Sequence, residues 1–168
     1  MGKEKSTAKT TIVTVLKKAN GEKIIWENHN LITNAGDLFM AEKLAGETPT
    51  NAFINCFLGS GAVAAAKDDD YSDFTLIAST EKAPSATYPK TNDQDADNSG
   101  KGADVCTWKF EWTTGDFNSA IIREGIISIA SATGTDAIFN RWIEGAAYEK
   151  SASATLTQYV NVTITGAA

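Results

Sequence analysis

The chain has 168 residues, of which 42% are hydrophobic and 21% charged, so a wholly disordered chain and a fibre are both excluded. Its formal net charge is -6, which gives no long-range attraction to nucleic acid or to anionic membranes, and we expect neither as a partner. No stretch approaches about 20 uninterrupted apolar residues, so no membrane-spanning segment is expected.

The first nine residues are locally basic, and we interpret residues 1–9 as an N-terminal arm. A frayed terminus and a docking arm both fit this composition. The apolar run at residues 12–16 is too short for a secretory signal, so export by that route is not expected. Met1-Gly2 with Ser6 matches a loose myristoylation pattern, which is short enough to arise by chance.

Residues 10–16 are rich in β-branched side chains, and Asn20-Gly21 precedes a second apolar run at residues 24–26. Asn-Gly tolerates the positive φ angles of a type I′ turn, so this region predicts a β-hairpin. The period then changes, and Asn34 can cap a short helix. Three apolar residues share one face of that helix: Leu38, Ala41 and Ala45.

The alternating apolar residues at 52–58 predict a further strand. Residues 59–102 form a long acidic loop region with one or two short strands, one of them near residues 75–79. The strand signal is strong beyond Ala103, where aromatic side chains alternate with polar ones over residues 106–112. Later strands are predicted over three stretches: residues 120–130, 138–143 and 156–164.

About eight strands at short spacing with one short helix predict an all-β fold, either a β-sandwich or a jelly roll. Residues 10–168 are accordingly interpreted as a single β-sandwich domain. Trp108 and Trp112 are expected to fill its core.

Residue types that carry chemistry are sparse. The only histidine, His29, falls at a predicted strand end without a nucleophile in a recognisable motif. Gly59-Ser60-Gly61 follows a strand but lacks the Gly-Lys-Ser/Thr ending of a phosphate loop. We therefore expect no enzyme, and no catalytic, cofactor-binding or metal-binding residue.

Cys56 and Cys106 lie fifty positions apart, with no further cysteine to complete a four-ligand zinc site. Both lie in alternating apolar segments, where either buried thiols or a disulfide between neighbouring strands would fit. Free thiols are favoured because no export signal is visible.

Three alternating carboxylates, Asp93, Asp95 and Asp97, with Asp104 in the twelfth place, resemble part of a calcium-binding loop. The sixth place holds Asn98 instead of glycine, and no flanking helices are predicted. We therefore interpret this segment as a solvated acidic loop, with a calcium site as the alternative.

Several strand-and-turn elements share a pattern: Asn30-Leu31-Ile32-Thr33-Asn34-Ala35-Gly36, Leu58-Gly59-Ser60-Gly61, Ile122-Arg123-Glu124-Gly125-Ile126-Ile127, Ala137-Ile138-Phe139-Asn140-Arg141-Trp142 and the Thr-rich strand from Leu156 to Ile164. Taken together, these elements resemble the small all-β virion structural proteins of tailed bacteriophages. Gly125 and Ile126 stand where that group usually has Ala and Gly.

The resemblance implies a non-enzymatic capsid decoration, or cement, protein that stabilises the head shell. Its partners would be the major capsid protein and copies of itself, and its location would be the virion, assembled in the bacterial host cytoplasm. A tail, baseplate or fibre-adaptor protein is the alternative, in which residues 59–102 contact another tail protein or a host glycan. A carbohydrate-active or lectin-like module is the third hypothesis.

Overall fold

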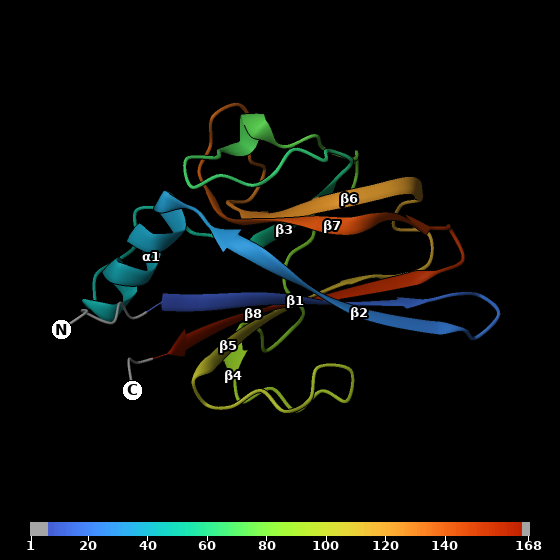
Figure 1. Cartoon of the computed structure of the whole chain (residues 1–168), viewed down its shortest axis with the longest axis horizontal. Helices are drawn as coiled ribbons and strands as arrows, with labels where there is room; N and C mark the ends of the chain where they lie inside the picture. Colours follow the sequence, from blue (N-terminus) through green and yellow to red (C-terminus); the bar gives the residue numbers. More distant parts are fainter. Residues whose placement is uncertain (1–6, 166–168) are drawn as a thin grey trace.

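A computed structural model describes residues 7–165, which form one antiparallel sheet of eight strands with a single α-helix (Figure 1). In chain order the elements are β1 (Thr7–Lys17), β2 (Lys23–Ile32), α1 (Asn34–Leu44), β3 (Asn55–Gly59), the 3-10 turn η1 (Tyr71–Asp73), β4 (Lys90–Thr91), β5 (Val105–Trp112), β6 (Ser119–Ser128), β7 (Ile138–Lys150) and β8 (Thr155–Thr165). The order across the sheet is β3-β6-β7-β2-β1-β8-β5-β4. The expected all-β fold with about eight strands and one short helix is confirmed.

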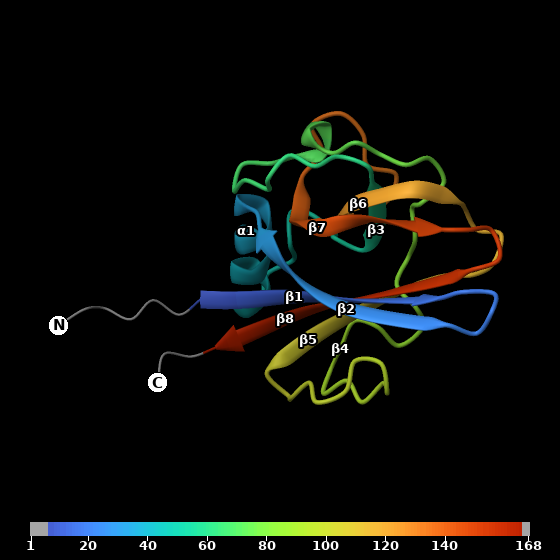
Figure 2. The same cartoon turned by 45° about the vertical axis from the view of Figure 1, so that its right-hand side comes forward.

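The sheet curls because β2 changes partner along its length. Its first part pairs with β1, from Lys17↔Lys23 to Thr11↔His29, and its last part, Asn30–Ile32, pairs with β7. The β3-β6-β7 half therefore lies over the β1-β8-β5 half (Figure 2). The inner faces enclose one large core that includes Ile12, Leu16, Trp108, Phe110, Trp112, Ile127, Phe139, Trp142, Leu156 and Val160.

The two edges of the curled sheet are joined by irregular chain. Ile77 N donates to Leu58 O (3.0 Å) and Lys82 exchanges two backbone hydrogen bonds with Cys56, which covers the outer edge of β3. Three residues further on, Ser85 N donates to Lys109 O of β5 (2.7 Å). Residues 75–85 thus satisfy edge groups that would otherwise invite strand pairing.

The helix differs from its prediction at the cap and in its packed face. Thr33 is the N-cap, and its Oγ1 accepts a hydrogen bond from Gly36 N (3.1 Å). Leu38 is half exposed, whereas Phe39 packs against the core. Gly36 lies close to the Phe139 carbonyl, and a side chain at this position would prevent that approach. This close contact determines which face of the helix packs against the sheet.

Three other local predictions need correction. Gly21, but not Asn20, has positive φ, so the first hairpin does not close with a type I′ turn. Residues 75–79 form no strand; Leu76 makes only an isolated bridge to Gly59. Residues 7–9 of the expected arm belong to β1, and residues 1–6 lie outside the described structure.

Gly125 in β6 faces Trp142 in β7 across the register, and the Trp142 indole lies directly over it. A Cβ at Gly125 would overlap that ring, and Trp142 is only 1% exposed, so the ring has little freedom to move. The large side chain therefore requires a glycine opposite it.

We predict that Gly125→Ala lowers the free energy of unfolding by about 1–3 kcal/mol through overpacking. Gly145→Ala in β7 is the control, because no atom lies within 4 Å of its added Cβ. Urea unfolding of both variants measures the difference. Equal midpoints would contradict the packing described here.

Candidate functional site

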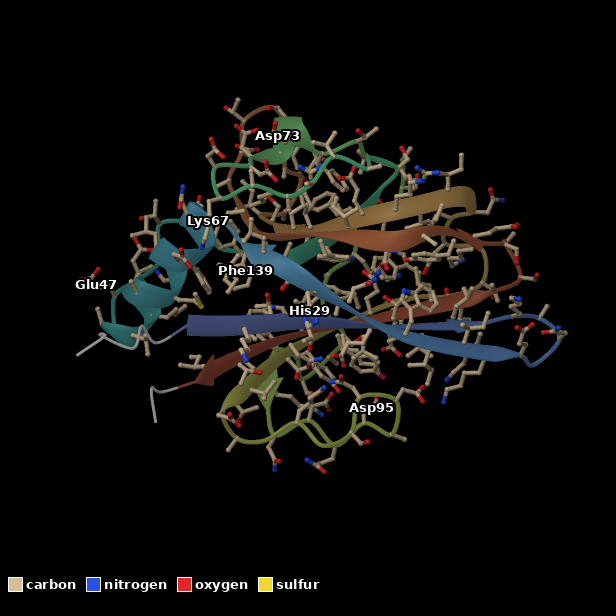
Figure 3. All side chains as sticks on the ribbon, in the orientation of Figure 1. His29, Glu47, Lys67, Asp73, Asp95 and Phe139 are labelled. Carbon is tan, nitrogen blue, oxygen red and sulfur yellow. The ribbon has the colours of Figure 1, made fainter. Side chains whose placement is uncertain are left out.

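The long acidic region divides into two segments, and each covers the outer side of one half of the curled sheet. We call residues 60–82 the upper loop and residues 83–104 the lower loop. Figure 3 shows Asp73 in the upper loop and Asp95 in the lower loop, on the two sides of the molecule. Since both loops are irregular, the contacts that fix them determine which surface the protein presents.

A buried ion pair between β6 and β7 lies beneath the upper loop. Arg141 Nη2 and Nε donate to Glu124 Oε2 at 2.8 and 3.1 Å. The Glu124 side chain has no exposed surface and that of Arg141 is 2% exposed. Neither charge can be buried alone without a large desolvation cost, so each requires the other.

The same two side chains also form hydrogen bonds that hold the upper loop. Arg141 Nη1 donates to Asp69 Oδ2 (2.9 Å), and Nη2 lies 3.4 Å from Val63 O. Glu124 Oε1 accepts backbone hydrogen bonds from Gly61 (2.8 Å) and Thr75 (2.9 Å). One carboxylate therefore fixes both ends of the segment between residues 61 and 75.

Gly59-Ser60-Gly61 receives a structural explanation from this geometry. A Cβ on Gly61 would collide with the Glu124 carboxylate, so glycine lets the backbone approach close enough to donate. The anion at these glycines is thus a carboxylate of the chain itself.

The lower loop is anchored by a second buried network, which corrects the interpretation of a solvated acidic loop at Asp93 and Asn98, whereas most of their neighbours are exposed. Asp93 has no exposed side-chain surface and accepts from Tyr88 Oη and Asn98 Nδ2, both at 2.9 Å. Asn98 and Asn161 of β8 exchange amide hydrogen bonds of 3.0 and 2.9 Å, and Thr107 Oγ1 donates to the same Asn161 oxygen. The polar outer face of β5 and β8 is therefore covered.

The three alternating carboxylates of the calcium hypothesis each have a lysine partner. Lys90 lies 3.1 Å from Asp93, Lys109 lies 3.0 Å from Asp95, and Lys17 and Lys23 both pair with Asp97. Within residues 7–165, no group of three or more His, Cys, Asp or Glu side chains is arranged to hold a metal ion.

Burial and hydrogen bonding have opposite effects on the pKa of Asp93 in this network. Burial acts to raise it, but hydrogen bonds from Asn98, Lys90 and Tyr88 outweigh burial, so the pKa lies below its ordinary value. The carboxylate therefore stays charged at neutral pH.

A third buried carboxylate, Glu144 of β7, lies inside the curled sheet. Its Oε2 accepts from Trp26 Nε1 (2.9 Å) and from Asn28 Nδ2, and its Oε1 has no partner among the described residues. Burial raises the pKa of this carboxyl, and the Trp26 indole only partly offsets that effect. Unlike Glu124, Glu144 has no cation beside it in the part of the chain described.

The remaining candidate residues are not brought together. His29 is exposed within β2 rather than at its end. Cys56 is buried and Cys106 half-buried, and both are free thiols. Trp108 and Trp112 are 6% and 1% exposed, so the expectation of core aromatics is confirmed.

Three buried charged residues are not among the candidates predicted from the sequence: Glu124, Arg141 and Glu144. Each interrupts an apolar strand segment, and a charge at a position expected to be covered is a sign of a buried partner. That sign does not identify the partner.

No protein-family model, curated protein or solved structure matches this chain. No helix within residues 7–165 is long and apolar enough to cross a membrane.

Arg141→Met is predicted to destabilise the protein by about 3–5 kcal/mol, because it leaves Glu124 buried without a cation. Lys18→Met is the control: its ion pair with Glu22 is exposed and screened by solvent, so its loss should change the unfolding midpoint little. Denaturant unfolding measures both, and Arg141→Lys, which keeps the charge, should fall between them. Equal losses for Arg141→Met and Lys18→Met would contradict the role of the ion pair.

Glu144→Gln is predicted to stabilise the protein at pH 7 and to lose that advantage below about pH 4.5. The folded pKa of Glu144 is raised, so its protonated form favours folding, and stability falls as the pH rises from the unfolded pKa of 4.5 through the folded value. Glutamine stays neutral throughout and can still accept from Trp26.

Thermal unfolding at pH 7 and pH 4 measures this effect, with Glu22→Gln as the control. Lys18 lowers the pKa of Glu22 through a hydrogen bond and its charge, so that variant should change in the opposite direction at pH 7. A Glu144→Gln effect that is independent of pH would contradict the assignment.

Proposed function

We propose that the chain is a structural protein of a tailed-bacteriophage virion, and specifically a capsid decoration protein. It would bind the outside of the head shell, next to the major capsid protein and further copies of itself. The single observation that carries this proposal is the convergence of the elements that resemble such proteins. Gly59 and Gly61, Glu124 and Arg141 come from three separate elements and meet in one buried cluster.

A cluster of this kind supports a scaffold rather than an enzyme. Both oxygens of the Glu124 carboxylate accept hydrogen bonds from Arg141, Gly61 and Thr75, so neither oxygen is free to take up a proton from a substrate. The result is a rigid attachment of an exposed loop to a sheet, which suits a protein that must present one fixed surface.

An apolar hollow beside α1 supports a contact with another protein. Its volume is about 310 Å³, and its lining includes Met40 and Leu44 of α1, Trp108 of β5 and Ile164 of β8. Leu44 is 77% exposed and Ile164 is 49% exposed, and together with the hollow they form a contiguous apolar surface of the kind found at protein contacts. A shell subunit seated here would cover them.

The finer architecture, a β-sandwich or jelly roll, belongs to the same proposal. It is supported by the two halves of the curled sheet, which face each other across one core.

Copy number in purified virions tests the proposal. We expect hundreds of copies per particle by quantitative mass spectrometry, and we expect that stripping the protein lowers the heat resistance of heads while leaving tails intact, since it would stabilise the assembled shell by binding it. A few copies or a dozen would instead place it in the tail, baseplate or fibre adaptor and would overturn the decoration assignment.

A further inference from the structure

β1 and β2 separate from each other near the helix and leave a wedge between them. They pair as far as Thr11↔His29, after which β1 continues along β8 to Thr7 and β2 continues along β7. Figure 1 shows β2 leaving β1 in the direction of α1. The cavity between them has a volume of about 620 Å³, and both strands line it over residues 8–11 and 29–32.

The register shows which β1 backbone groups face this wedge. Ile164 N donates to Asp104 O (3.1 Å), so the even-numbered residues of β8 bond toward β5 and the odd-numbered ones toward β1. Because Thr163 is opposite Lys9, the odd-numbered residues of β1 bond to β8. The N–H and C=O of Ala8 therefore face the wedge, where they have no strand partner within residues 7–165.

The backbone groups of β2 alternate in the same way. Thr33 N donates to Phe139 O of β7 (3.0 Å), so odd-numbered positions here bond toward β7 and Ile32 faces the wedge. At the narrow end, Thr10 Oγ1 donates to Asn30 O (3.1 Å) and closes the gap. The edge of β1 at Ala8 and the edge of β2 at Ile32 therefore face each other without backbone hydrogen bonds between them.

Asn30 contributes its backbone carbonyl to the narrow end of the wedge, whereas both polar atoms of its side chain are buried from solvent and have no hydrogen-bond partner among the described residues. The free backbone groups of the two strand edges, and not this carboxamide, are therefore the groups that a ligand in the wedge would pair with.

The charges around the wedge favour an acidic ligand. Lys9 lines it and forms no ion pair with a residue in the described range, and the His29 ring beside it can donate a hydrogen bond. Lys67 and Asp37 also line it but neutralise each other at 2.6 Å. Figure 3 shows His29 above β1 and Lys67 near the start of α1.

We propose that this wedge binds an extended segment of another polypeptide, which adds a strand to the free edge of β1 at Ala8 and places an acidic side chain beside Lys9 and His29. Strand addition of this kind takes its affinity from backbone hydrogen bonds and its selectivity from the flanking side chains. The inference is independent of the proposed function, since it rests on unpaired backbone groups.

Backbone amide shifts of the full-length ¹⁵N-labelled protein test the proposal, with the capped peptide Thr-Val-Glu-Val-Thr as the probe. We expect shifts at the backbone amides of Ala8 and Ile32 at millimolar peptide. The matched peptide with Lys in place of Glu should bind about two- to fivefold more weakly, as expected for one exposed charge pair.

Ala8→Pro should abolish these shifts, because it removes the N–H that faces the wedge while Lys9 keeps its bonds to β8. Ala8→Val is the matched control and should bind as the parent does. Absence of shifts with the Glu peptide, or shifts that survive Ala8→Pro, would overturn the proposal. Binding only after residues 1–6 are removed would identify the chain's own N-terminus as the occupant, and would also overturn it.

Discussion

The Glu124 carboxylate, shared between the Arg141 guanidinium and two backbone amides, holds the upper loop on the sheet. The segment it fixes is irregular, so its backbone groups find few partners in a strand ladder. Burial makes the carboxylate dependent on Arg141, and Arg141 in turn reaches Asp69 of the loop. The upper loop therefore stays in place only while Glu124 and Arg141 are paired. The covering of β3, β6 and β7 by this loop depends on the same ion pair.

Buried side-chain hydrogen bonds also hold the lower loop, but the central pair consists of neutral amides instead of an ion pair. The Asn98–Asn161 amide pair joins the loop to β8, and Asp93 is charged but surrounded by donors. With both outer faces covered, an exposed apolar hollow and the unpaired strand edges of the wedge remain at the end of the molecule near α1. The apolar hollow and the wedge between β1 and β2 both lie there, which concentrates the proposed contacts at one end.

Much of the strand content could be predicted from local pattern, because alternation over residues 106–112 reports which face is buried. The helix and its approximate start were also predictable, but the choice of Thr33 over Asn34 as cap depends on hydrogen bonds to β7. The ion pair could not be predicted, since it depends on the register of β6 and β7 and on a loop more than 40 residues away. Burial of Asp93 likewise depends on Asn161, which is distant in sequence.

Native-state hydrogen exchange of two loop amides tests the central role of Glu124 most directly. Gly61 and Thr75 donate to its carboxylate, whereas Val63 lies between them with a side chain that is 73% exposed. The account predicts that the Gly61 and Thr75 amides exchange within about tenfold of the slow amides of β6, and that Val63 exchanges rapidly. Exchange at Gly61 and Thr75 as fast as at Val63 would show that the carboxylate does not hold the loop, and would contradict the account.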